Sequence, residues 1–221
     1  MKNSILVLAL LFMANLMFGQ SSDNTHGKSV LLITSAQVDL LSESGKAWGF
    51  TQESVEKNQM RKNLLKVIKE ARKRNIPIIH SPVGFDYELM KGFEPLNAIQ
   101  GVIVQNQLLA VNTPGVDFIP EAQPKSGDIV LPFRQGFSSF WAKSIQAHLK
   151  KMGIETIYVV GMLAEGCVES HARDAAENGY KTVVISDAIG STSMELYEAS
   201  LKTLALHTAG IITTKEFLNG K

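Results

Sequence analysis

Short apolar segments that favour β-strands alternate along this chain with longer segments of helical periodicity, and this alternation restricts the fold most. The strand-like segments cover residues 29–34, 76–80, 128–131, 156–160, 182–186 and 211–213. The helix-like segments lie between them, near residues 55–75, 97–108, 140–152, 165–178 and 194–207. Strands joined through whole helices must pair in parallel, and a parallel sheet needs cover on both faces. We therefore predict a doubly wound, Rossmann-like α/β domain with six parallel strands in a three-layer αβα arrangement.

The first twenty residues have the pattern of a secretory signal peptide. Lys2 supplies a positive start, residues 5–18 form an apolar run, and Gly19-Gln20 offers a small residue near a cleavage point. The run is shorter than the ~20 apolar residues that span a membrane. An uncleaved anchoring helix is the alternative. We expect a signal peptide over 1–20, a polar linker over 21–28 and one domain over 29–221, with a secreted or periplasmic product that leaves the membrane after cleavage.

The charges of the chain are balanced. It has 22 basic against 21 acidic side chains, and the basic residues form no dense cluster. Nucleic-acid-binding surfaces need such a cluster because they neutralise phosphates. We therefore expect a small-molecule partner and no nucleic acid.

Cys167, the only cysteine, follows the strand-like segment 156–160 and falls in the first turn of the next helix. The free N–H groups and the dipole at a helix start favour a thiolate there, and they are suited to an oxyanion. A single cysteine forms no disulfide within its own chain. The alternatives are a small buried side chain, which is the common fate of a free cysteine, or pairing between molecules. The position alone favours nucleophile and buried residue about equally.

Several motifs around Cys167 resemble the isochorismatase-like cysteine hydrolase family. They are Gly161 to Val168, Ala172-Arg173-Asp174-Ala175, Gly179-Tyr180 and Asp187-Ala188, with Gln37, Asp39, Pro114-Gly115, Gly127-Asp128 and Ser138-Ser139-Phe140 upstream. The resemblance implies a six-stranded parallel sheet and a homo-oligomer. It also implies a non-proline cis peptide near Met162-Leu163, in a turn where Met162, Leu163 and Gly166 help to form the oxyanion hole.

The same resemblance implies a catalytic triad of aspartate, lysine and cysteine, and two of its positions have changed here. The aspartate position is Ser35 and the lysine position is Arg134, so only Cys167 is retained. Arginine keeps a positive charge but does not readily release a proton. Serine is a poor proton acceptor near neutral pH. Loss of general acid–base catalysis costs ~10²–10⁴-fold in rate if nothing replaces it.

The remaining site candidates are expected to lie in or near the substrate pocket: Gln37, His80, Phe137, Phe140, Glu165 and His171. His171 lies four residues after Cys167, so it is a candidate base, or else a helix histidine hydrogen-bonded at a subunit contact. Glu165 is a candidate acid, or a first-turn carboxylate that complements the helix dipole. The nicotinamidase branch of the family binds a metal through an Asp-x-His pair. His80 is isolated, so we expect no metal and no cofactor.

Three functions remain open from the sequence. The first is an exported hydrolase that cleaves an amide-type C–N bond of a small molecule through a thioester on Cys167. The second is a catalytically impaired relative that binds a small molecule in the same pocket. The third is a redox-sensitive thiol protein, because Arg134 would hold a thiolate exposed to oxidants.

Overall fold

The computed structural model describes residues 28–141 and 144–221, so the predicted signal peptide lies outside the described residues. These residues form a six-stranded sheet in the order β3-β2-β1-β4-β5-β6, in which every neighbouring pair is parallel. The strands are β1 (Ser29–Thr34), β2 (Ile78–Ser81), β3 (Ile129–Val130), β4 (Thr156–Gly161), β5 (Lys181–Ile189) and β6 (Gly210–Ile212). The predicted doubly wound α/β fold is confirmed.

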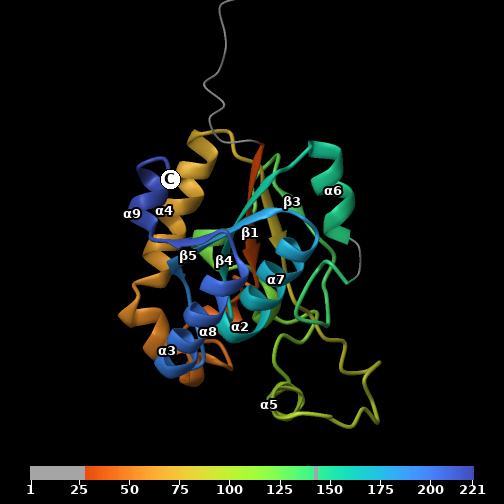
Figure 1. Ribbon diagram of the computed structural model, residues 1–221. Coiled ribbons are helices and arrows are strands. Elements are labelled where there is room, and N and C mark those ends of the chain that lie inside the picture. Colours follow the sequence, from red (N-terminus) through yellow and green to blue (C-terminus); the bar gives the residue numbers. More distant parts are fainter. Residues whose placement is uncertain (1–27, 142–143) are drawn as a thin grey trace, which may run out of the picture.

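Helices cover both faces of the sheet and complete the three layers. One face carries α3 (Trp48–Lys57), α4 (Met60–Lys73) and α9 (Thr214–Leu218); the other carries α6 (Ser144–Met152), α7 (Glu169–Glu177) and α8 (Met194–His207). Figure 1 shows α4 and α9 on one side of the strands and α6 and α7 on the other. None of the described helices is long and apolar enough to cross a membrane.

The central strand β1 explains why the strand-like segments are apolar throughout. Leu31 and Ile33 pack into the core under α4, while Val30 and Leu32 pack into the core under α6 and α7. A strand covered on both faces has no polar face, so its sequence is a continuous apolar run. The predicted boundaries 29–34 are those of β1.

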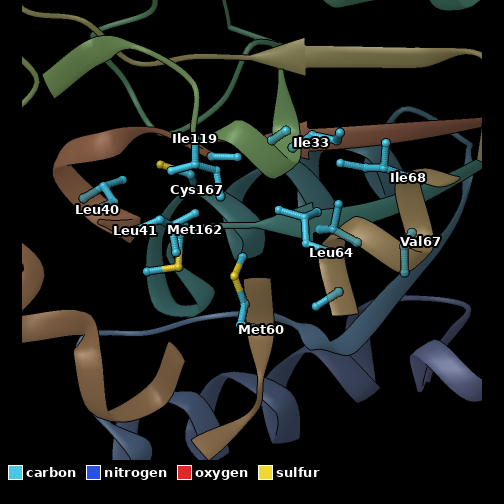
Figure 2. Close-up of a cluster of buried hydrophobic side chains, with 14 of the residues drawn as sticks. Ile33, Leu40, Leu41, Met60, Leu64, Val67, Ile68, Ile119, Met162 and Cys167 are labelled. Carbon is cyan, nitrogen blue, oxygen red and sulfur yellow. The ribbon is translucent and has the colours of Figure 1, made fainter. Parts of the chain in front are cut away.

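The core under α4 extends to the cysteine. Figure 2 shows Leu64, Val67 and Ile68 of α4 packed near Ile33, with Cys167 at the opposite end of the cluster on the side of Leu40. The thiol is 7% exposed and belongs to this cluster. Cys167 therefore lies where the apolar core meets the edge formed by the carboxyl ends of the strands.

The helices differ from the predicted segments in several places. The segment 55–75 belongs to two helices rather than one, because Gln59 between α3 and α4 takes a left-handed conformation with φ of 48°. The helix near 165–178 begins with a π-helical turn, η3 (Ala164–Val168), before α7. Two short helices, α2 (Val38–Leu41) and α9, fall below the length at which helical periodicity is recognisable.

Helix α5 (Ala98–Asn106) lies away from the layers. It belongs to the long connection between β2 and β3, and Figure 1 shows it beside the body of the domain at the end where α2 lies. Its sequence is mainly apolar, yet none of its residues is buried. Such a helix must have its apolar side chains on a cavity or an exposed surface.

Candidate active site

Four adjacent strands bring the key side chains together at their carboxyl ends. Ser35 follows β1, Ser81 ends β2, Arg134 lies four residues beyond β3, and Cys167 lies in the turn after β4. Ligands of open parallel sheets bind at this edge. The backbone holds Arg134 there, because its N–H donates to the carbonyl of Pro82 at 3.2 Å. The site is thus assembled from segments that are distant in the sequence and neighbouring in the sheet.

The guanidinium of Arg134 is the centre of this arrangement. Its Nε donates to Ser81 Oγ at 2.9 Å, and its Nη2 donates to Ser35 Oγ at 2.7 Å and to the Ser81 carbonyl at 3.3 Å. Its Nη1 donates to the Gly136 carbonyl at 2.6 Å and to Cys167 Sγ at 3.4 Å. Arginine has five N–H donors, so all of them are used.

The charge of Arg134 is buried without a carboxylate. The side chain is 6% exposed, and within residues 28–141 and 144–221 no Asp or Glu forms an ion pair with it. A buried charge with no opposite charge is costly. Of the five groups that Arg134 contacts, four are uncharged oxygen acceptors and the fifth is the thiol of Cys167. The arrangement therefore places a positive charge without a carboxylate partner beside this thiol.

The turn after β1 presents the hydroxyl of Ser35 to Arg134. Ser35 has a left-handed backbone with φ of 47°, and its N–H donates to the Ser81 carbonyl at 3.1 Å. Gln37 fixes the following loop, since its side-chain amide donates to the carbonyls of Val83 and Val116 and accepts from the Val83 N–H. Gln37 is thus a buried brace and not a pocket residue.

The turn that holds Cys167 has the cis peptide that the family resemblance implied. The bond between Met162 and Leu163 is cis, and the Leu163 carbonyl accepts from the N–H groups of Gly166 and Val168. The hydroxyl of Thr34 donates to the Met162 carbonyl at 2.7 Å and ties this turn to β1. Met162, Leu163 and Gly166 therefore surround the cysteine, and their part in an oxyanion hole stays a prediction.

His171 is a structural side chain in this site. Its Nε2 accepts from the Ser139 N–H at 3.0 Å, so its Nδ1 carries the proton and donates to the Cys167 carbonyl at 2.7 Å. Burial, with a smaller effect of the Arg134 charge, lowers the pKa of His171 to about 3. A neutral imidazole with both nitrogens occupied does not take a proton from the thiol at neutral pH. These contacts therefore favour the alternative interpretation, a hydrogen-bonded helix histidine, over a catalytic base.

Three other candidates also have structural roles. Glu165 accepts from the Ser191 hydroxyl and from the N–H and hydroxyl of Thr192. His80 is buried with Nε2 3.3 Å from Asp128 Oδ2, and burial lowers the pKa of this imidazole. Phe140 packs in the core under α6.

A cavity of about 390 Å³ opens above Cys167 and Ser35. Its wall is mostly apolar and comes from α2, the connection between β2 and β3 with its helix α5, the segment after β3 and the turn after β4. The residues of this wall are Leu40, Val83, Phe85, Met90, Phe93, Ile99, Gln100, Ile103, Val104, Leu108, Leu109, Gln135, Gly136, Phe137 and Leu163. Among the six pocket candidates in the described chain, Phe137 alone belongs to this wall. The other five were expected in or near the pocket, and they instead brace the loops and cores around it.

Sequence reasoning missed Ser81 and the wall from α5. Ser81 was within reach, because the sheet-edge rule directs attention to the residue after His80. The α5 residues could not be identified as pocket residues from the sequence, because the periodicity of their segment is weak. Among the described residues, no three His, Cys, Asp or Glu side chains form a cluster suited to a metal ion.

Sequence comparison finds the same family across nearly the whole described chain. A family model described as the isochorismatase domain matches residues 29–216. An uncharacterised isochorismatase family protein of Bacillus subtilis, YwoC, is 34% identical over 102 residues, which are 46% of this chain and 53% of that protein. The ureidoacrylate amidohydrolase RutB of Rhizobium rhizogenes is 31% identical over 137 residues, 57% of this chain and 55% of RutB. The chain thus spans about half the length of these relatives.

Comparison with solved structures agrees on the fold. A crystal structure described as a cysteine hydrolase from Pseudomonas syringae pv. phaseolicola matches with a TM-score of 0.75 and 19% identity. The match covers 87% of this chain and 91% of that chain. At this identity the likeness shows the shared α/β architecture.

Proposed function

Because the chain belongs to the isochorismatase family of hydrolases, we propose that it hydrolyses an amide-type C–N bond of a small molecule through Cys167. The observation that carries this proposal is the contact of 3.4 Å between Arg134 Nη1 and Cys167 Sγ at the inner end of the cavity. A relative named as an amidohydrolase supports the bond type. The guanidinium supplies the charge that keeps a nucleophilic thiolate in place.

The proposed reaction has two steps. The thiolate attacks the amide carbonyl carbon, and the C–N bond breaks to leave a thioester on Cys167 while the amine takes a proton from water. The hydroxide left by that proton transfer then attacks the thioester carbonyl, the C–S bond breaks, and the carboxylic acid and the thiolate are released. Arg134 moves no proton in either step, because an arginine guanidinium does not readily give one up.

Mass spectrometry tests this mechanism directly. Incubation of the wild type with a panel of 4-nitroanilides should release 4-nitroaniline, and rapid acid quenching should trap an acyl group on the peptide that contains Cys167. Cys167→Ala should lose both signals. Turnover that persists in Cys167→Ala would refute the thioester route.

A binding protein without turnover is the second candidate. It is favoured by the polar contacts of the site, since Ser35 and Arg134 offer no proton acceptor at neutral pH and His171 is fully hydrogen-bonded. Ser35→Asp would place a carboxylate beside Arg134 and the thiol. A wild type that binds amides without cleaving them, together with turnover in Ser35→Asp, would identify the present protein as the binder.

We also propose that the protein is exported, on the signal-peptide pattern of residues 1–20. Expression of the full chain in a Gram-negative host and cell fractionation test this. The exported product should begin near Gln20 by N-terminal sequencing, and full-length protein held in the cytosol would contradict the proposal.

A further inference from the structure

Apart from the Cys167 thiolate of the proposed function, the described wall of the cavity has no charged side chain. Its polar side chains are Ser35, Gln100, Gln135 and Cys167, and no Asp, Glu, Lys or Arg of the described ranges lines it. Ser35 already accepts a hydrogen bond from Arg134. A bound molecule therefore meets two amide side chains, the thiol and otherwise apolar groups.

Two charged side chains that contact residues of the cavity wall, Arg134 and Asp39, already have hydrogen-bond partners. Arg134 uses its five N–H donors on Ser35, Ser81, Gly136 and Cys167. The Asp39 carboxylate accepts from the Leu109 N–H at 2.6 Å and from the Lys46 N–H at 3.2 Å. A carboxylate group on a ligand would find no free cation in the described wall of this cavity, and burial of an unpaired charge is strongly unfavourable.

The apolar wall favours ligands that carry apolar groups. Ile99, Ile103 and Val104 of α5 contribute apolar surface, and Phe85 and Phe93 contribute aromatic rings from the preceding loop. A cavity of about 390 Å³ lies within the range of small-molecule sites. Burial of apolar groups against such a wall gives binding energy in proportion to their area.

We propose that the substrates are uncharged amides with an apolar acyl group, such as a short aliphatic chain or an unsubstituted ring. This assignment rests on the proposed function, because the thioester keeps the acyl group on Cys167 in both steps while the amine departs. The acyl group is therefore the part that must fit the wall made by α5 and the loop after β2.

Protection of the thiol measures this preference without needing turnover. Acetamide, butanamide, pentanamide and hexanamide should slow the alkylation of Cys167 by iodoacetamide with dissociation constants that improve about fourfold per methylene. Succinamate, which is similar in length to pentanamide and ends in a carboxylate, should protect at least tenfold more weakly than pentanamide. Equal protection by succinamate and pentanamide, or no gain along the series, would overturn the proposal.

A charge placed in the wall should reverse the preference. Ile103→Lys introduces a cation on α5, so succinamate should protect better than pentanamide in this variant. Leu206→Lys adds the same charge to α8 at a side chain that is 82% exposed, and it should keep the wild-type order. A wild-type order in Ile103→Lys, with an unchanged circular dichroism spectrum, would count against this wall as the binding surface.

Two readouts separate this inference from the proposed function. Hexanoyl-4-nitroanilide should be cleaved at least tenfold faster in kcat/KM than succinyl-4-nitroanilide if both proposals hold. Protection by hexanamide with no cleavage of any anilide would refute the hydrolase and support the apolar ligand class. Cleavage with preference for the succinyl compound would support the hydrolase and refute the ligand class.

Discussion

Arg134 connects four strand ends through one planar side chain. Its acceptors belong to the turn after β1, the end of β2, the segment after β3 and the turn after β4. The fork geometry of a guanidinium suits this, because its donors point in fixed directions within one plane. An ammonium has three donors on a flexible stem and cannot reach the same set.

Arg134→Lys should therefore weaken both the fold and the site. At least two of the present hydrogen bonds have no donor in this variant, and each buried group left without a partner costs about 1–3 kcal/mol. We expect a lower free energy of unfolding in urea and slower alkylation of Cys167 at pH 7. Arg173→Lys is the matched control, since Arg173 is a partly exposed partner of Glu169 and such pairs contribute under about 1 kcal/mol. Equal effects of the two variants would contradict the central role of Arg134.

His171 should make the protein sensitive to acid. Its pKa is about 3 in the folded chain against about 6.5 unfolded, so between these values the unfolded chain binds one more proton. Stability from this residue is complete above pH 6.5 and decreases as the pH falls towards 3, by up to ~1.4 kcal/mol per pH unit. His80 shifts in the same direction and adds to the wild-type slope.

The variant His171→Asn isolates the contribution of this imidazole. Urea unfolding at several pH values between 4 and 6 should give a slope about 1.4 kcal/mol per pH unit smaller than that of the wild type. A slope equal to that of the wild type would show that the folded protein protonates this side chain.

At the level of elements, the strands were more predictable than the helices. Buried parallel strands are apolar at every position, so β1, β4 and β5 could be located within a few residues. The separation of α3 from α4 depends on one left-handed residue, Gln59, which apolar spacing does not reveal. The role of α5 depends on a cavity that no local pattern encodes.

The site was likewise predictable only in part from the sequence. Cys167 was found from its place after a strand, while Ser35 and Arg134 were assigned by motif resemblance. The convergence of their side chains on one another, and the role of Ser81, depend on strand order, which sequence spacing does not specify. The role of His171 stayed open because helical spacing shows proximity to Cys167 and not the direction of its hydrogen bonds.

Two glycines test the backbone requirements of these elements. Gly161 ends β4 with φ of 114°, and a Cβ there would lie 2.0 Å from the Thr34 carbonyl oxygen. Gly161→Ala should lower the free energy of unfolding by more than about 3 kcal/mol, since neither backbone can move without breaking the β1–β4 pairing. Gly101→Ala in α5 meets nothing within 4 Å and should raise it by about 0.5–1 kcal/mol. Thermal and urea unfolding measure both, and similar changes in the two variants would contradict this view.

At the level of the whole molecule, the sheet separates two apolar cores. One lies under α4 and includes Leu64 and Ile68; the other lies under α6 and α7 and includes Leu149. The two cores share the strands but none of their buried side chains. Side chains in different cores therefore have no common neighbour to relax when one is truncated.

A double-mutant cycle measures this separation. Leu64→Ala and Leu149→Ala should each cost about 2–5 kcal/mol, and their combination should equal the sum within about 0.5 kcal/mol. Leu64→Ala combined with Ile68→Val, one turn apart in the same core, should depart from additivity. A large coupling between Leu64 and Leu149 would show that strain crosses the sheet.

The distances in sequence between Arg134 and its partners determine when the Cys167 thiol meets the guanidinium during folding. Arg134 reaches back 99 positions to Ser35 and forward 33 positions to Cys167. A chain in which either half is still unfolded has its cysteine without the guanidinium, and such long-range contacts form late because they close large loops. The Cys167 thiol therefore meets the guanidinium only when both halves of the chain have folded.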